Sequence, residues 1–261
     1  MITTIMTITM IIPGAASMTD PAILLIHGSA HGAWCWRDLL AELHRRGINA
    51  RAIDLPSHGM DETPYAEITL DSYRDAILAD IAAHGNSPVM LVGHSAGGYA
   101  ITAAAEAAPE RIASLVYLCA YVPADGMSLG DMRRAASDHP VLGLIEKTAD
   151  GLAFRFKTEA GVEALCHDCS DEAKTYVRAH LGPQAIRPQE TPLRVTEASR
   201  ALPRHYVICE NDRVIPPIEQ RKMCAGWPEE TVHSLSSGHS PYFARPERLA
   251  DTLREILHRT R

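Results

Sequence analysis

The chain has 261 residues, of which 46% are hydrophobic and 22% charged, a composition typical of globular proteins. This length accommodates one large α/β domain with an insertion and a sizeable buried core. The formal net charge of -7 and the lack of a basic run argue against a general nucleic-acid binder. No apolar stretch reaches the roughly 20 residues that cross a bilayer, so we predict a cytoplasmic protein without a membrane segment.

The first residues differ in composition from the rest. Met1–Met10 consists of Met, Ile and Thr, without a Lys or Arg. A secretory signal peptide starts with a positively charged segment, so this stretch is a poor signal although Ala15-Ala16-Ser17 is similar to a cleavage site. We therefore predict that residues 1–18 form a disordered extension, and an export signal is the weaker alternative.

Six cysteines are scattered along the chain. Cys119 and Cys209 lie in apolar runs typical of buried strands, where a free cysteine behaves as a small hydrophobic residue. The segment Cys166-His167-Asp168-Cys169 has the spacing of a metal or redox site, but the second pair that such a site needs is missing. We therefore predict reduced thiols, no metal and no cofactor.

Signals for strands and helices alternate from residue 19 to residue 122. Continuous apolar runs are typical of strands buried on both faces, and apolar residues at helical spacing indicate amphipathic helices. The expected strands are Ile23–Ile26, Asn49–Leu55, Val89–Val92 and Leu115–Ala120, and the expected helices are Trp36–Arg46, Leu70–Ala83 and Tyr99–Ala108. This alternation predicts a parallel sheet flanked by helices, with the loops after the strands gathered at the edge where α/β proteins bind ligands.

The alternation breaks after Pro123, where the chain becomes more polar and irregular. Two apolar runs around Asp150-Gly151 predict a hairpin, and short helices are expected at Ala160–Leu165 and Asp171–Leu181. The sheet is expected to resume at His205–Cys209 and Val232–Leu235, before a last helix at Pro246–His258. We therefore predict a core at residues 19–122 and 201–261, with a cap insertion at residues 123–200 over the strand ends.

The pattern Gly93-His94-Ser95-Ala96-Gly97 lies between an expected strand and an expected helix. A strand, a sharp turn and a helix are the context of a nucleophile elbow, in which a serine in a strained backbone conformation exposes its hydroxyl above the sheet. The flanking residues must be small so that strand and helix can approach each other. Ser95 is therefore the candidate nucleophile.

Several stretches of the chain resemble the α/β-hydrolase superfamily, in which the catalytic residues follow in the order Ser, Asp, His, each after a strand. Within it, the chain is similar to small carboxylesterases related to plant methylesterases, plant hydroxynitrile lyases and bacterial pyrethroid-type hydrolases. The likeness covers about residues 22–257 and is weakest in the expected cap. The matching stretches are Leu25–Gly28, His31–Trp34, Asp54-Leu55, Gly93–Gly98, Asn211-Asp212, Gly238–Phe243 and Pro246–Leu249.

The resemblance implies a catalytic triad of Ser95 as nucleophile, His239 as general base and Asp212 as the acid that orients the histidine. The chemistry agrees, because a serine hydroxyl needs an imidazole to take its proton, and a buried carboxylate fixes the imidazole tautomer. The backbone N–H groups of Ala96, after the nucleophile, and Ser29, after the first strand, are the expected oxyanion hole.

Other titratable residues are weaker candidates for these roles. Among the 13 histidines, His94 is next to the nucleophile but is directed elsewhere by its backbone position, and His233 lies inside an expected strand. Asp125 is the alternative acid, since some relatives of this fold carry the acid after the preceding strand. We interpret Asp131, Asp138 and Asp150 as solvated cap residues.

The resemblance predicts an enzyme that hydrolyses small to medium carboxylic esters through an acyl-enzyme. Lactones of the N-acyl homoserine type are the alternative substrates, since the same serine chemistry that cleaves an ester opens a lactone ring. A hydroxynitrile lyase is disfavoured, because Gly28 and Ser240 stand where those enzymes have a threonine and a lysine. A non-catalytic ligand-binding scaffold is disfavoured, because all three triad residues are present.

The expected partner is a small-molecule ester or lactone, with no nucleic acid and no membrane, and a homodimer is left open. Four residues are candidates for lining the substrate pocket, although core packing explains them equally well: Trp34, Tyr121, Met127 and Leu129.

Overall fold

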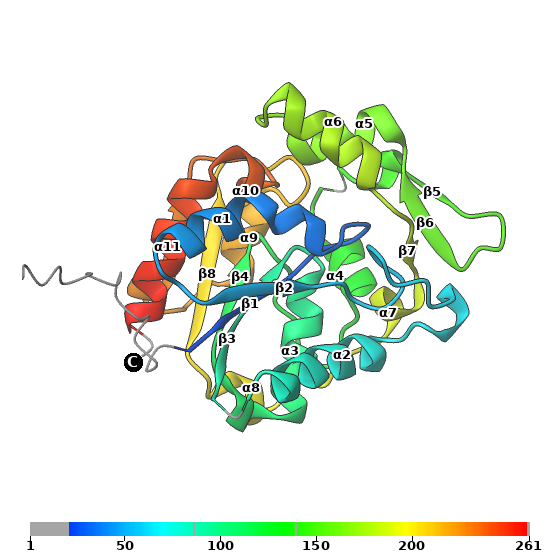
Figure 1. The fold of residues 1–261 in the computed structure, drawn as a ribbon. Helices are drawn as coiled ribbons and strands as arrows, with labels where there is room; N and C mark the ends of the chain where they lie inside the picture. Colours follow the sequence, from blue (N-terminus) through cyan, green and yellow to red (C-terminus); the bar gives the residue numbers. More distant parts are fainter. Residues whose placement is uncertain (1–20, 86, 139, 260–261) are drawn as a thin grey trace, which may run out of the picture.

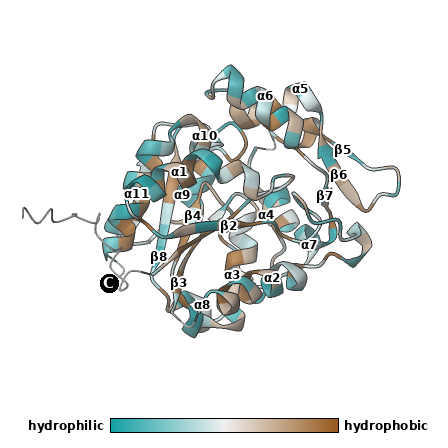
Figure 2. Cartoon of the chain, in the orientation of Figure 1, coloured by the Kyte–Doolittle hydropathy of each residue, from teal (hydrophilic) through white to brown (hydrophobic). Residues whose placement is uncertain are grey.

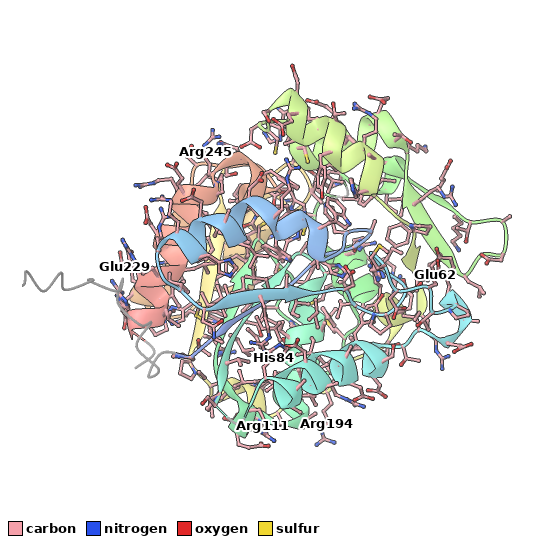
Figure 3. All side chains as sticks on the ribbon, in the orientation of Figure 1. Glu62, His84, Arg111, Arg194, Glu229 and Arg245 are labelled. Atoms are coloured by element: carbon pink, nitrogen blue, oxygen red, sulfur yellow. The ribbon has the colours of Figure 1, made fainter. Side chains whose placement is uncertain are left out.

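The computed structural model describes residues 21–85, 87–138 and 140–259. The predicted extension at residues 1–18 lies outside the described residues. Charged side chains such as Glu62, Arg194, Glu229 and Arg245 point outward at the surface (Figure 3).

The centre of the fold is a parallel sheet. Its six strands in the described part of the chain are β1 (Ile23–Ile26), β2 (Ala50–Ile53), β3 (Val89–His94), β4 (Ile112–Leu118), β8 (Arg204–Cys209) and β9 (Val232–Leu235). They follow in the order β2-β1-β3-β4-β8-β9, and every neighbouring pair is parallel. The predicted α/β-hydrolase fold with its mostly parallel sheet is confirmed.

Helices cover both faces of this sheet (Figure 1). In β1, Ile23 and Leu25 pack on the side of α1 (Arg37–Arg45) and α11 (Pro246–Arg259), whereas Leu24 and Ile26 face α2 (Leu70–Ala83) and α3 (Gly97–Ala107). Successive side chains of a strand point to opposite faces, so a continuous apolar run supplies two cores at once. Figure 2 shows the resulting hydrophobic colours on the central strands.

A smaller unit lies beside the sheet and includes an antiparallel three-stranded sheet (Figure 1). It contains β5 (Ile145–Lys147), β6 (Ala153–Phe156), β7 (Gln184–Ala185), α5 (Thr158–Cys166) and α6 (Asp171–His180). The predicted hairpin is confirmed as the β5–β6 pair, and Gly151 in its turn has a φ of 70°. The third strand, β7, was not predicted, since two residues leave no periodic signal.

Short helices make up most of the difference between the predicted and observed elements. Five helices of the described chain were not predicted: α4 (Leu129–Ala135), α7 (Arg187–Glu190), α8 (Glu197–Arg200), α9 (Pro217–Met223) and α10 (Pro241–Ala244). Helix α3 begins at Gly97 rather than at Tyr99, because the glycines of the elbow are already helical. Strand β4 ends one residue before Cys119, whose φ of 35° is incompatible with a strand.

Candidate active site

Ser95 lies in the sharp turn between β3 and α3, with a φ of 52°. A non-glycine residue with positive φ is strained and marks a site of function. A Cβ atom on Gly93 would lie 2.8 Å from the Gly97 carbonyl oxygen, and one on Gly98 would lie 2.1 Å from the Tyr121 carbonyl oxygen. The flanking glycines are therefore required by close packing of strand, helix and the next loop, which leaves Ser95 at the rim of the sheet.

His239 and Asp212 form a buried pair on the two loops that follow β9 and β8. His239 Nδ1 donates to Asp212 Oδ2 at 2.7 Å. The other carboxylate oxygen of Asp212 accepts from the backbone N–H groups of Val214 and Ile215, at 2.7 and 2.9 Å. Since the carboxylate accepts the Nδ1 proton, the Nε2 nitrogen of the imidazole is left free to act as a base.

Gln220 on α9 is a supporting residue that the sequence did not single out. Its Nε2 donates to Asp212 Oδ2 at 3.0 Å and to the Ile215 carbonyl at 2.7 Å, while its Oε1 accepts from the Cys209 N–H at 3.0 Å. The side chain is fully buried. It fixes the carboxylate against the end of β8, a role that only the folded chain reveals.

The alternative candidates for the acid and the base do not take part in the Asp212–His239 pair. Asp125 is exposed and accepts from the Val195 backbone N–H at 2.9 Å. His94 Nε2 donates to the His239 carbonyl at 2.8 Å, and His233 lies beside His205 on the outer strands. Among these candidates in the described chain, Asp212 and His239 are therefore the carboxylate and the imidazole that the geometry pairs.

Ser95 and His239 line the same pocket. Most of its wall is apolar and comes from the smaller unit and the loop after β8. The residues that complete the lining are Ser29, His31, His94, Tyr121, Arg133, Val141, Phe154, Phe156, Leu165, Val214 and Ile215. An apolar pocket with a few convergent polar groups is typical of a small-molecule site.

The four predicted pocket residues are placed differently from one another. Tyr121 lines the pocket of Ser95. Trp34 stacks on His31 and packs among other aromatic rings, and Leu129 is buried in a separate apolar cluster behind the elbow. The backbone of Met127 bridges to Leu193. Trp34, Met127 and Leu129 are not among the residues that line this pocket, and the side chains of Trp34 and Leu129 pack in neighbouring apolar clusters.

The candidate oxyanion donors lie on either side of the nucleophile. The backbone N–H groups of Ser29 and Ala96 have no acceptor among the described residues, whereas the N–H of Ala30 donates to Gln184 Oε1 at 3.2 Å. Ser29 Oγ accepts from Gln189 Nε2 at 2.7 Å, which fixes the loop. A Cβ atom on Gly28 would lie 2.8 Å from Ser95 Cβ, so glycine at this position keeps the loop close to the nucleophile.

Two further histidines beside the nucleophile are neutral at pH 7. Burial lowers the pKa of His31 to about 4, and burial together with the nearby His239 lowers the pKa of His94 well below its usual value. A neutral His94 adds no positive charge next to His239.

Metal-ligating side chains gather at one place in the described chain, where atoms of His94, Cys119 and His239 lie within 4.8 Å of one another. Both histidines already use a ring nitrogen in hydrogen bonds, to the His239 carbonyl and to Asp212. We therefore assign this group to the hydrogen-bonded environment of the base and place no metal there.

The segment Cys166-His167-Asp168-Cys169 contacts the loop that carries His239. Asp168 Oδ2 accepts from the Gly238 N–H at 2.8 Å and lies 3.4 Å from Ser237 Oγ. The two cysteines are free and buried, and their thiols lie against Ser240. The segment thus joins the smaller unit to the residues on both sides of the base.

Replacing Asp168 with alanine is expected to lower kcat for ester hydrolysis roughly tenfold to a hundredfold, because small displacements of a catalytic group are costly. Asp168→Asn keeps a side-chain acceptor for Gly238 and should recover most of the activity. The control is Glu163→Ala on α5, whose carboxylate pairs with Lys174 on the surface. Steady-state kinetics and thermal unfolding distinguish mispositioning from unfolding, and unchanged kcat in the alanine variant would show that the contact is dispensable.

Comparison with known proteins places the chain in a family. The Alpha/beta hydrolase family matches residues 23–252. Methylesterase 17 of Arabidopsis thaliana is 29% identical over 245 residues, which cover 88% of this chain and 89% of the relative. The pyrethroid hydrolase of Sphingobium wenxiniae is 29% identical over 248 residues, covering 92% and 88%. A solved structure of a pyrethroid hydrolase from Sphingobium faniae has a TM-score of 0.80 at 28% identity and covers 91% of this chain and 97% of that one.

Because the family match spans most of the chain, the protein belongs to the alpha/beta hydrolase family. Its named relatives are esterases and hydrolases, and the chain is an enzyme of the hydrolase class. The resemblance inferred from the sequence motifs is confirmed. In the part of the chain that the structure describes, no helix has the length and apolar character needed to span a bilayer.

Proposed function

We propose that the chain is a serine carboxylesterase that hydrolyses small to medium carboxylic esters through an acyl-enzyme on Ser95. The observation that carries the proposal is the buried 2.7 Å hydrogen bond between His239 and Asp212, on a pocket that also contains Ser95. The strained φ of 52° at Ser95 supports the role of this serine, and the name of one relative, a methylesterase, supports an ester as substrate.

In the proposed reaction, Ser95 Oγ attacks the ester carbonyl while His239 Nε2 takes the serine proton. Asp212 holds the imidazole in the required tautomer and stabilises its protonated form. The N–H groups of Ser29 and Ala96 stabilise the negative oxygen of the tetrahedral intermediate. Protonated His239 then gives its proton to the leaving alkoxide, and water activated by the same imidazole releases the acid.

Two other activities use the same scaffold. A lactone is a cyclic ester, and the same residues would open it, so the assay must include one. Cyanohydrin lysis is disfavoured, since Ser240 is buried against the hydroxyl of Tyr242 and provides no ammonium group for departing cyanide.

The test combines turnover with covalent labelling. The enzyme is incubated with p-nitrophenyl acetate, butyrate and octanoate and with an N-acyl homoserine lactone, each with and without a serine-directed phosphonate. We expect ester turnover, inhibition by the phosphonate, and its mass on the peptide that contains Ser95. Turnover of the lactone alone would replace the carboxylesterase assignment with a lactonase, and neither turnover nor label would favour a binding scaffold.

A further inference from the structure

Arg133 brings a positive charge to the pocket of Ser95. It lies on α4 and is half-buried. Among the described residues that line this pocket, Arg133 is the one lysine or arginine, and none is an aspartate or glutamate. Asp212 lies behind His239, with its oxygens occupied by four hydrogen bonds. The charge of Arg133 therefore dominates a wall that is otherwise apolar or neutral.

This arginine lacks a carboxylate partner in the described chain. Arg133 Nη2 donates to the neutral Gln189 Oε1 at 3.0 Å. No described carboxylate oxygen forms an ion pair with it within 4.0 Å. The next residue, Arg134, instead pairs with Asp131 and Glu190 at 2.8 and 2.9 Å. A cation in a partly dry pocket that is not neutralised by the protein is suited to bind an anionic group.

The position of Arg133 places such a group close to the reacting centre. Gln189 accepts from Arg133 and donates from Nε2 to Ser29 Oγ at 2.7 Å. Two hydrogen bonds thus connect the guanidinium to the loop that carries a candidate oxyanion donor. One small molecule can therefore place an anionic group on Arg133 and an ester carbonyl at Ser95.

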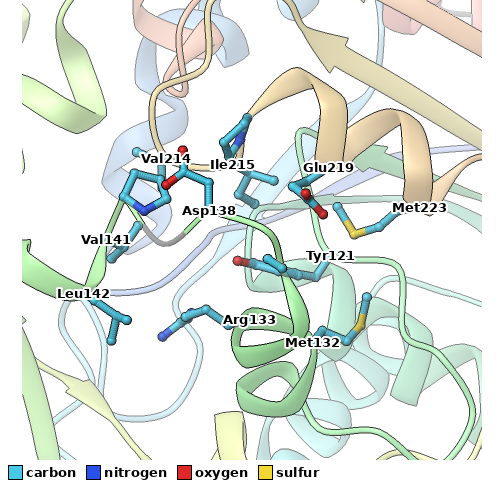
Figure 4. A pocket seen from close by; sticks show the side chains of 13 residues that line it. Tyr121, Met132, Arg133, Asp138, Val141, Leu142, Val214, Ile215, Glu219 and Met223 are labelled. Carbon is cyan, nitrogen blue, oxygen red and sulfur yellow. The ribbon is translucent and has the colours of Figure 1, made fainter.

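Arg133 also lines a second cavity, in which its side chain lies near Leu142 (Figure 4). Two acidic residues, Asp138 and Glu219, line this cavity too, and Glu219 pairs with Lys222 at 2.7 Å, so this side of Arg133 is not positive and does not favour a carboxylate.

A groove of about 380 Å³ between α4, α7 and the β5–β6 hairpin is also lined by Arg133. This groove contains Arg134 and Lys147 but a single acidic residue, Glu190, which Arg134 neutralises. The groove is therefore net positive on a chain with a net charge of -7.

We propose that Arg133 forms a carboxylate-binding subsite, and that the preferred substrates are esters that carry a carboxylate a few carbons from the reacting carbonyl. The planar guanidinium can hold both oxygens of such a group, and the apolar surroundings strengthen the interaction. This inference rests on the proposed ester hydrolysis and adds the class of ester.

The test compares charged and neutral esters of matched size. One pair is p-nitrophenyl hemiglutarate and p-nitrophenyl pentanoate, which differ by a carboxylate on the acyl side. The other is 4-acetoxybenzoate and phenyl acetate, which differ on the alcohol side. We expect the wild-type kcat/KM to favour the charged member of at least one pair by about tenfold or more, in line with hydrogen bonds between charged groups. The pair that shows the preference identifies the side of the ester that Arg133 binds.

Variants assign this preference to Arg133. Arg133→Met should lower kcat/KM for the charged ester about 10- to 100-fold more than kcat/KM for the neutral ester, so that the wild-type preference is lost. Arg133→Lys should keep part of the preference, because the charge remains. The control is Arg178→Met. It removes an exposed arginine of α6 that pairs with Glu159 of α5.

The outcomes separate this inference from the proposed function. Equal kcat/KM for charged and neutral esters in the wild-type enzyme, or a preference that survives in Arg133→Met, overturns the carboxylate subsite and leaves the esterase assignment intact. Absence of turnover with all four esters overturns both. If Arg133→Met does not fold, the wild-type preference and the Arg133→Lys ratio still decide the question.

Discussion

Replacing Ser95 with alanine should lower kcat for p-nitrophenyl esters by about four to six orders of magnitude, as losses of triad nucleophiles do. The hydroxyl is the atom that forms the acyl-enzyme, and the neighbouring groups supply no substitute nucleophile in the proposed reaction. The residual rate should reflect binding and the oxyanion donors alone.

Two measurements accompany this variant. The phosphonate label should disappear from the peptide that contains residue 95, and the unfolding temperature should change little, since alanine and serine tolerate the φ of 52° about equally. Ser234→Ala, on the exposed side of β9, serves as the control and should keep full activity. Retained turnover in Ser95→Ala would eliminate the proposed nucleophile.

Replacing Asp212 with asparagine is expected to lower kcat by about 10⁴-fold. The carboxylate accepts four hydrogen bonds, from two backbone N–H groups, from Gln220 and from His239. An amide can accept only through its oxygen, so its NH₂ group would face a donor. If that donor is His239, the imidazole changes tautomer and Nε2 can no longer take the serine proton.

The same substitution should destabilise the fold by about 1–3 kcal/mol, because a buried donor loses its acceptor. Kinetics between pH 6 and pH 9 and thermal unfolding measure the two effects. Asp125→Asn is the matched control, since this alternative acid is exposed and bonded to the Val195 backbone. Loss of activity in Asp125→Asn with retention in Asp212→Asn would reverse the assignment of the acid.

The central sheet could be predicted because its signal is local. A strand such as Ile23–Ile26 is buried on both faces and has no polar residue, and the small residues around Ser95 are needed wherever a strand turns sharply into a helix. The short helices α4 and α9 could not be predicted, since seven residues contain too few turns for an apolar period. Each of these two helices is stabilised by contacts with residues that the fold brings next to it.

The supporting residues of the site could not be predicted for a different reason. Gln220 and Arg133 have partners that the fold brings together, and nothing in their neighbours along the chain marks them. Asp168 lies in a segment whose cysteine spacing suggested a metal or redox site rather than a contact to the loop of His239. Asp168 contacts a residue 70 positions away, and Gln189 contacts one 160 positions away. Trp34 shows the converse, because it was a candidate for lining the pocket, whereas its ring stacks on His31.

The contact between Asp168 and the loop of His239 links two parts of the molecule energetically. Any displacement of α5 and α6 that breaks the 2.8 Å hydrogen bond to Gly238 also releases the segment that carries the base. Coupling free energies are reciprocal. An interaction that stabilises the position of the His239 loop therefore stabilises the position of α5 and α6 by the same coupling free energy. A ligand that orders the imidazole would therefore slow hydrogen exchange in α6, which contributes no residue to the lining of the Ser95 pocket.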